Sequence, residues 1–249
     1  MLFYGLLKIV ILGPLLRVLF RPWVKGLEHI PAEGSVIVAS NHLSFSDSFF
    51  MPLMLPRPVY FLAKSDYFTG TGLKGKLTAA FFRGVRSVPI DRASAASADP
   101  ALQTALRILG DGHVLGLYPE GTRSPDGRLY KGRTGIARIA LASGVPVVPC
   151  VMIGTFEIQP PGQVRPRIKK VGVKFGEPLD FTRYAEMPGA IDDRFILRSI
   201  TDEIIYALMA LSGQEYVDIY ATEAKKIIAE ECRHAAEERK RAAQDEEKP

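Results

Sequence analysis

Residues 35 to 47 read Ser-Val-Ile-Val-Ala-Ser-Asn-His-Leu-Ser-Phe-Ser-Asp, an apolar and β-branched run that ends in polar residues. Because such a run is typical of a buried strand, we expect a strand over residues 35–40 that places Asn41 and His42 at its C-terminal edge. A helix with Asp47 in its first turn should follow, where a negative charge is favoured. In α/β folds, ligands bind at such strand edges.

His42 and Asp47 lie five positions apart in this stretch. Within one continuous helix they would point about 140° apart, because each residue turns about 100°. If His42 instead lies in the turn before the helix, the carboxylate can accept a hydrogen bond from one imidazole nitrogen. The other nitrogen is then free to remove a proton from a substrate hydroxyl. The alternative is a histidine that only ties down a loop.

The composition limits the class of protein. With 249 residues and no linker rich in proline, glycine or serine, a single α/β domain is expected. The net charge of +5 suits an anionic partner but does not choose between nucleic acid, phospholipid and a phosphorylated metabolite. Two cysteines and four histidines offer neither a disulfide framework nor a zinc-ligand spacing, so we expect no metal and no resident cofactor.

Residues 1–23 are apolar, carry only basic charges and are interrupted by Pro14. This pattern disfavours a membrane-spanning helix and indicates a helical segment that lies in the membrane interface. The alternative is a helix packed on the protein's own core. Residues 24–212 should form the central domain, and residues 213–249 a charged helical extension that is near neutral overall and is not a nucleic-acid arm.

Strand-like and helix-like segments alternate through the central domain, which predicts a mostly parallel sheet flanked by helices. The expected strands, besides 35–40, are 24–28, 58–64, 85–90, 114–118 and 145–151. The expected helices are 73–82, 100–109, 136–142 and 195–211, with a long solvated helix beyond Ala221. The predicted molecule is therefore one α/β domain with an N-terminal interfacial anchor and a long C-terminal helical tail.

A second polar stretch, Tyr-Pro-Glu-Gly-Thr-Arg-Ser over residues 118–124, follows an expected strand directly. Its glycine-containing turn can offer backbone N–H groups to an anion, and Arg123 can bind a phosphate group in bidentate fashion. An ordinary tight turn with a surface arginine is the alternative. Lys131 extends the basic character, and Arg92 follows the strand at 85–90, so one shared site is expected. Arg86, Arg133 and Arg138 are interpreted as surface arginines without a role in that site.

Taken together, the blocks at 41–47, 118–124 and 145–149 resemble the glycerolipid acyltransferases with the HxxxxD motif. The chain is most similar to the 1-acyl-sn-glycerol-3-phosphate acyltransferase family. A weaker block at 90–92 departs from the family pattern, in which a glycine stands shortly before Ile/Val-Asp-Arg. Here Arg86 occupies the nearest position, and Gly84 lies two residues earlier.

The resemblance implies that His42, held by Asp47, removes the proton from the acceptor hydroxyl as that hydroxyl attacks an acyl thioester. It also implies that the acceptor phosphate is held mainly by Arg92, Arg123 and Lys131. The full set of expected substrate-binding residues is Asn41, Ser44, Arg92, Glu120, Gly121, Thr122, Arg123 and Lys131.

The function implied by the resemblance is acylation of lysophosphatidic acid to phosphatidic acid in phospholipid biosynthesis, on the cytoplasmic face of the cell membrane as a peripheral protein. Acyl-CoA and acyl carrier protein are both open as acyl donors, and membrane phospholipids are expected partners. Two alternatives stay open. One is the same chemistry on another acceptor, such as glycerol 3-phosphate, another lysophospholipid or a glycolipid, and the other is a catalytically silent protein that binds anionic lipid.

Overall fold

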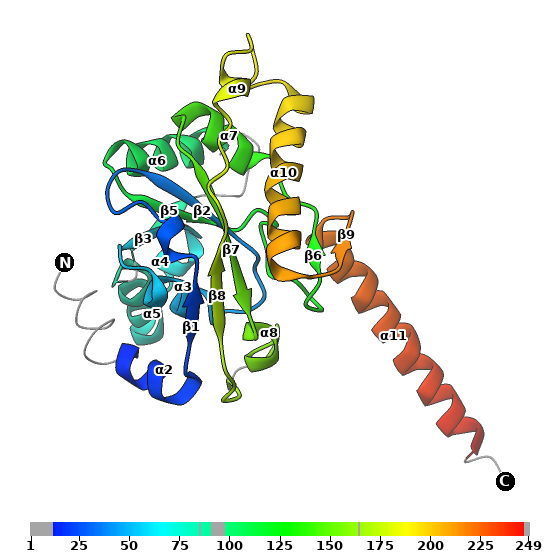
Figure 1. The fold of residues 1–249 in the computed structure, drawn as a ribbon. Coiled ribbons are helices and arrows are strands. Elements are labelled where there is room, and N and C mark those ends of the chain that lie inside the picture. The colour runs from blue at the N-terminus through cyan, green and yellow to red at the C-terminus, as the bar shows by residue number, and fades with distance from the viewer. Residues whose placement is uncertain (1–11, 85, 91–97, 164, 247–249) are drawn as a thin grey trace.

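Seven strands form the central sheet of the molecule, in the order β1-β8-β7-β2-β5-β3-β4 (Figure 1). The computed structural model describes residues 12–84, 86–90, 98–163 and 165–246. The strands of this sheet are β1 (Trp23–Lys25), β2 (Val36–Ser40), β3 (Val59–Lys64), β4 (Ser87–Ile90), β5 (Val114–Leu117), β7 (Val147–Ile153) and β8 (Gly172–Phe175). All neighbouring strands run parallel except β7 and β8. The α/β fold with a mostly parallel sheet is therefore confirmed.

A second, two-stranded sheet pairs β6 (Leu129–Tyr130) with β9 (Tyr216–Val217). The main helices are α2 (Leu12–Phe20), α3 (Asp47–Met54), α5 (Gly72–Gly84), α6 (Ala98–Gly110), α7 (Gly135–Ser143), α10 (Arg194–Ser212) and α11 (Ala221–Glu246). Shorter helical turns are η2 (Leu27–His29), α4 (Asp66–Thr69), α8 (Thr155–Ile158) and α9 (Thr182–Ala185).

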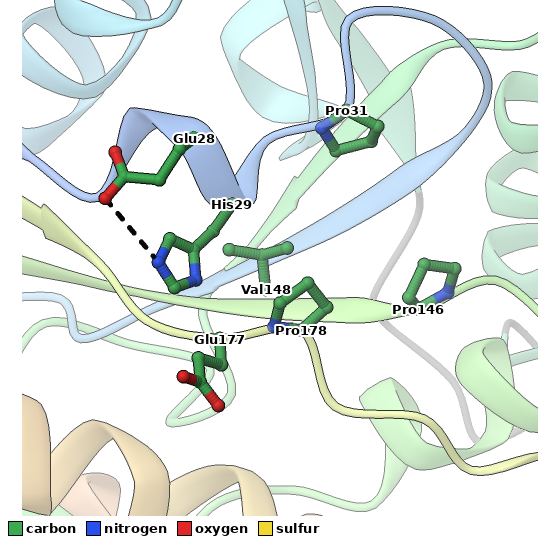
Figure 2. A pocket seen from close by; sticks show the side chains of 7 residues that line it. All are labelled: Glu28, His29, Pro31, Pro146, Val148, Glu177 and Pro178. Carbon is green, nitrogen blue, oxygen red and sulfur yellow. Dashed lines mark ion pairs between the residues drawn. The ribbon is translucent and has the colours of Figure 1, made fainter.

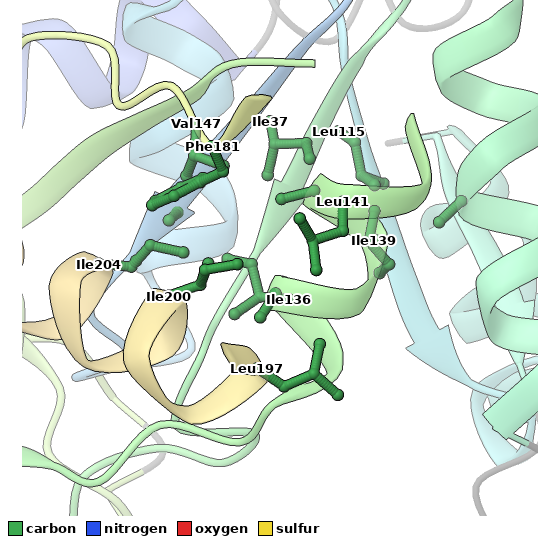
Figure 3. Packing of buried hydrophobic residues seen from close by; sticks show 14 of the residues in the cluster. Ile37, Leu115, Ile136, Ile139, Leu141, Val147, Phe181, Leu197, Ile200 and Ile204 are labelled. Atoms are coloured by element: carbon green, nitrogen blue, oxygen red, sulfur yellow. The ribbon is translucent and has the colours of Figure 1, made fainter. Parts of the chain in front are cut away.

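The central strand β2 is buried on both faces, because its alternating side chains enter two different apolar layers. Ile37 belongs to the layer formed with α6, α7 and α10, and part of that packing is drawn in Figure 3. Val38 belongs to the opposite layer, which includes Phe50 of α3 and Phe20 of α2. Helices on both faces thus hold β2 rigidly and fix the position of the residues that follow it.

One expected strand is shorter than the sequence pattern indicates. The prediction of a strand over 24–28 is wrong beyond Lys25, because residues 27–29 form the turn η2. Gly26 adopts a left-handed φ of 77°, and a Cβ atom at this position would lie 2.1 Å from the Phe175 carbonyl oxygen. The strand therefore ends where the chain turns sharply against β8.

In the described residues, each end of the chain is a helix. The expected interfacial anchor lies mostly outside the described residues, which include α2 but not residues 1–11. In α2, Leu15 and Val18 are 53% and 74% exposed, whereas Phe20 packs edge-on against Phe50. Across the described residues, every helix is too short or too polar to cross a bilayer. At the other end, α11 begins against the domain and then projects away from it (Figure 1).

Candidate active site

Three loops meet at the edge of the sheet where the parallel strands β2, β5 and β7 end. The order β7-β2-β5 makes these three strands neighbours, so the segments that follow them lie together. His42 comes two residues after β2, and the loop of residues 118–124 follows β5. The Ser124 N–H donates to the His42 carbonyl oxygen over 2.7 Å, which joins the two sequence motifs directly.

The His42 imidazole and the Asp47 carboxylate form a hydrogen-bonded pair, with Nδ1 2.9 Å from Oδ2. The same carboxylate oxygen accepts the backbone N–H groups of Leu43 and Ser44, at 2.7 and 2.8 Å. Asp47 is fully buried, whereas the His42 side chain is 17% exposed. Since a carboxylate only accepts, Nδ1 must carry the proton, and Nε2 is left as the acceptor. This arrangement has the geometry of a general base held in one tautomer.

The Glu120 side chain links the backbone of His42 to that of Tyr130 in the second sheet. One carboxylate oxygen accepts the N–H of His42 and the other accepts the N–H of Tyr130, both at 3.1 Å. Burial raises the pKa of Glu120 to about 8, although the two backbone hydrogen bonds oppose the shift. Glu120 is thus a buried brace beneath the candidate catalytic turn, residues 41–46.

The expected phosphate-binding residues have unequal surroundings. Within the described part of the chain, the half-buried Arg123 guanidinium has neither a hydrogen-bond nor an ion-pair partner. Lys131, in contrast, forms an ion pair with Asp218, 3.0 Å away. Arg92 lies outside the described residues. The strand before it, β4, is separated from β2 by β3 and β5.

Asn41 and Ser44, expected to contact substrate, are fully buried and have partners within the protein. The Asn41 amide donates to and accepts from the Met152 backbone, at 3.3 and 2.8 Å, and donates to Gln214 at 2.7 Å. The Ser44 hydroxyl donates to the Gln159 carbonyl oxygen at 2.8 Å. These contacts hold the catalytic turn against β7 and the segment after it, and they leave neither side chain free to reach a ligand.

Gly121 and Thr122 lie in the loop between the two motifs. Gly121 has a left-handed φ of 74°, and a Cβ atom there would approach the Arg133 side chain to 3.0 Å. The Thr122 hydroxyl accepts a hydrogen bond from the Lys225 ammonium over 2.6 Å. The loop is therefore enclosed by side chains that come from other parts of the chain.

Three residues of this site are absent from the sequence-based prediction. Tyr118 stacks on the His42 ring, with centroids 3.8 Å apart and planes at 15°. Gln214 and Lys225 come from residues 213–249, which the composition assigns to a solvated extension. A usable signal is the spacing of Ala221 and Ala224, which are both buried against Tyr130 and mark one face of α11 as packed.

A cavity of about 510 Å³ lies elsewhere (Figure 2). It is bounded by residues around η2 and the beginning of β7, among them His29, Pro146 and Glu177. Since His42 follows the other end of the neighbouring strand, this cavity is at the opposite edge of the sheet. Nowhere in the described ranges do three histidine, cysteine or acidic side chains gather closely enough to hold a metal ion.

Comparison with known proteins agrees with this geometry. A family model described as Acyltransferase matches residues 21–153, which is more than half of the chain. The chain belongs to this acyltransferase family. The match contains both motifs, the strands β2 and β5 that precede them, and the neighbouring strand β7.

Individual relatives of this chain include proteins named as acyltransferases. The 1-acyl-sn-glycerol-3-phosphate acyltransferase of Limnanthes alba is 32% identical over 158 residues, covering 63% of this chain and 54% of the relative. The Bacillus subtilis protein of the same name is 27% identical over 165 residues, covering 65% and 75%. The crystal structure of the 1-acyl-sn-glycerophosphate acyltransferase PlsC from Thermotoga maritima superposes with a TM-score of 0.58, with 28% identity and coverage of 76% and 71%. The chain thus spans about half the length of the plant relative that it matches.

Proposed function

We propose that this protein transfers a fatty acyl group from an acyl thioester to the free sn-2 hydroxyl of 1-acyl-glycerol-3-phosphate, which yields phosphatidic acid. The observation that carries the proposal is the His42–Asp47 pair, at 2.9 Å, beside a loop whose Arg123 has no partner among the described residues. A base and an unpaired cation on adjacent loops suit an acceptor that carries a hydroxyl near a phosphate group. The names of the relatives from Limnanthes alba and Bacillus subtilis support the same acceptor.

The first step is a proton transfer at His42. Its Nε2 accepts the proton of the acceptor hydroxyl while the hydroxyl oxygen attacks the thioester carbonyl carbon. Asp47, fully buried, keeps Nδ1 protonated and stabilises the imidazolium that forms. When the tetrahedral intermediate collapses, the carbon–sulfur bond breaks and the imidazolium returns the proton to the departing thiolate.

Direct transfer is favoured over an acyl-enzyme because the two serines between His42 and Asp47 are already engaged. Ser44 is fully buried, Ser46 nearly so, and both hydroxyls donate to Gln159 at 2.8 Å, one to its carbonyl oxygen and one to its side-chain oxygen. Neither is therefore available for activation by His42. The acceptor hydroxyl is the nucleophile, and Asn41 and Ser44 hold the catalytic turn rather than touch the substrate.

The activity is tested with purified protein, labelled acyl-CoA or acyl carrier protein thioester, and a panel of acceptors. Lysophosphatidic acid should be acylated at the sn-2 position, and His42→Ala should lower kcat by about 10²–10⁴-fold, the usual contribution of a general base. His29→Ala, at the opposite edge of the sheet, is the matched control and should keep wild-type activity. Equal activity in His42→Ala would refute the assigned base.

The acceptor panel separates the proposal from its alternatives. Preferred transfer to glycerol 3-phosphate, another lysophospholipid or a glycolipid would keep the chemistry and replace the acceptor. A protein that binds anionic lipid but transfers acyl groups from neither donor to any acceptor would be a silent binder. The donor that supports the larger kcat/KM identifies the carrier as coenzyme A or acyl carrier protein.

Peripheral attachment to the membrane forms part of the proposal, because substrate and product are both lipids. Its support is the apolar exposed face of α2, where Leu15, Val18 and Leu19 are 53%, 74% and 38% exposed. Deleting residues 1–20, or substituting Leu15→Glu with Val18→Glu, should abolish sedimentation with vesicles of anionic phospholipid. Ile168→Glu, at a position 64% exposed, is the control and should still sediment. Unchanged sedimentation of both altered proteins would defeat the attachment, and orientation toward the cytoplasm is tested by protease protection in cells.

A further inference from the structure

A lysine from the C-terminal helix reaches the loop that follows β5. The Lys225 ammonium lies 2.6 Å from the Thr122 hydroxyl, although the two residues are 103 positions apart in the chain. An ammonium has three N–H donors, and among the described residues the Lys225 ammonium makes this one hydrogen bond. Two donors are thus available for a ligand.

The position of Lys225 is fixed by packing on the helix that carries it. Ala221 and Ala224, which precede Lys225 in α11, are buried against the fully buried Tyr130. Tyr130 belongs to β6 and donates its backbone N–H to Glu120. The start of α11 is therefore built onto the same loop that braces His42.

Lys225 and Arg123 are half-buried cations, and neither forms an ion pair in the described parts of the chain. Burial and then the charge of Arg123 lower the pKa of Lys225, while Glu120 opposes that shift. Two desolvated like charges are unfavourable unless an anion lies between them. Their surroundings are those of a site for a group with more than one negative charge.

Exposed basic residues on the same helix lack these features. Lys226, the next residue, is exposed, and its side chain has no hydrogen bond or ion pair within the described residues. The approach of Lys225 to the loop is thus particular to one position on α11 and is not a general property of a basic helix.

We propose that Lys225 is a phosphate-binding residue, which completes with Arg123 a site for the phosphomonoester dianion of the acceptor. This inference rests on the proposed function and adds to it a binding residue from the C-terminal helix. Thr122 orients the ammonium, and the free N–H groups of Lys225 and Arg123 donate to the phosphate oxygens. The Ser124 N–H donates a hydrogen bond to the His42 carbonyl oxygen, which holds the loop next to His42. The dianion is therefore bound beside the base that takes the proton from the acceptor hydroxyl.

The test is a kinetic comparison of Lys225→Met, which keeps the length of the side chain but removes its charge, with Lys225→Arg and the control Lys226→Met. For lysophosphatidic acid, Lys225→Met should raise KM by about tenfold or more with kcat within about twofold, as expected for loss of one charge-assisted contact. Lys225→Arg should restore most of the affinity, and Lys226→Met should behave as the wild type. A KM unchanged in Lys225→Met would overturn the proposal.

A binding measurement separates this inference from the proposed function. sn-Glycerol 3-phosphate, as a soluble probe of the headgroup, should raise the Tm of the wild type and of Lys226→Met but not that of Lys225→Met, and glycerol should raise none. If the wild type fails to acylate lysophosphatidic acid, the proposed function fails, and the Tm shifts still decide the role of Lys225. An equal shift in wild type and Lys225→Met, or no shift in the wild type, would overturn it. Unliganded Tm values show whether each variant folds.

Discussion

Replacing Glu120 by glutamine tests the brace beneath the catalytic turn. Both carboxylate oxygens of Glu120 accept backbone N–H groups, from His42 and Tyr130, at 3.1 Å. Glutamine offers one oxygen, and its NH₂ group would face the second N–H donor. Since this leaves a buried donor unpaired, Glu120→Gln should lower the free energy of unfolding by about 1–3 kcal/mol.

The pH dependence of this difference follows from the pKa of Glu120. Burial raises that pKa from 4.5 to about 8 in the folded protein. Between these values the folded protein binds a proton that the unfolded chain does not, so the free energy of unfolding falls as pH rises. The slope from this group is at most about 1.4 kcal/mol per pH unit. Glutamine does not titrate, so the free energy of unfolding of the wild type minus that of Glu120→Gln should fall by up to about 4 kcal/mol between pH 5 and pH 8, which is enough to reverse its sign.

The assay is urea unfolding followed by circular dichroism at several pH values in this range. Glu237→Gln, at an exposed position on α11, is the control and should follow the wild type at every pH. If the stability of the wild type relative to Glu120→Gln stays constant or rises with pH, Glu120 is ionised throughout this range in the folded protein. Burial would then not raise the pKa of Glu120 as described.

Substitutions at three further positions test other parts of the site and its support. Asp47→Asn removes the charge that stabilises the imidazolium, so kcat should fall by about 10²–10⁴-fold in the acyl-transfer assay; retention of wild-type kcat would contradict the pairing with His42. Tyr118→Phe keeps the ring stacked on His42 and should change kcat by less than about twofold, whereas Tyr118→Ala should lower it by up to about tenfold; equal effects would show that the stack has no role. Gly116→Ala, in β5, places a Cβ atom 2.6 Å from the Phe61 ring of β3 and should lower the free energy of unfolding by about 1–3 kcal/mol in urea titration; an unchanged midpoint would contradict the packing.

The hydrogen-bonded pair of His42 and Asp47 could be predicted from sequence because its geometry is local. The apolar run before Asn41 indicates a buried strand, and Asp47 is close enough in sequence to reach His42 through one turn. Asn41 has the same local setting, but its partner Met152 lies 111 positions away. Nothing local distinguishes a polar side chain that faces a ligand from one that bonds a neighbouring strand.

The parts of the fold that sequence reasoning missed are short or depend on distant partners. Strand β8 has four residues and lies antiparallel to β7, which an alternating pattern of strands and helices does not predict. The strands β6 and β9 have two residues each, too few for a periodicity. Lys225 lies in a helix rich in charge, and its role depends on Thr122, 103 positions earlier.

The pairing of β6 with β9 has a consequence for how the protein folds during its synthesis. Residues 118–130 leave the ribosome well before residues 214–225. The later segment contains β9, which pairs with β6, and also Gln214 and Lys225, which contact Asn41 and Thr122. The half-made chain therefore holds His42 and Asp47 without the segment that encloses the loop beside them. We expect the nascent protein to fold its sheet early and to gain acyl-transfer activity only when the start of α11 has emerged.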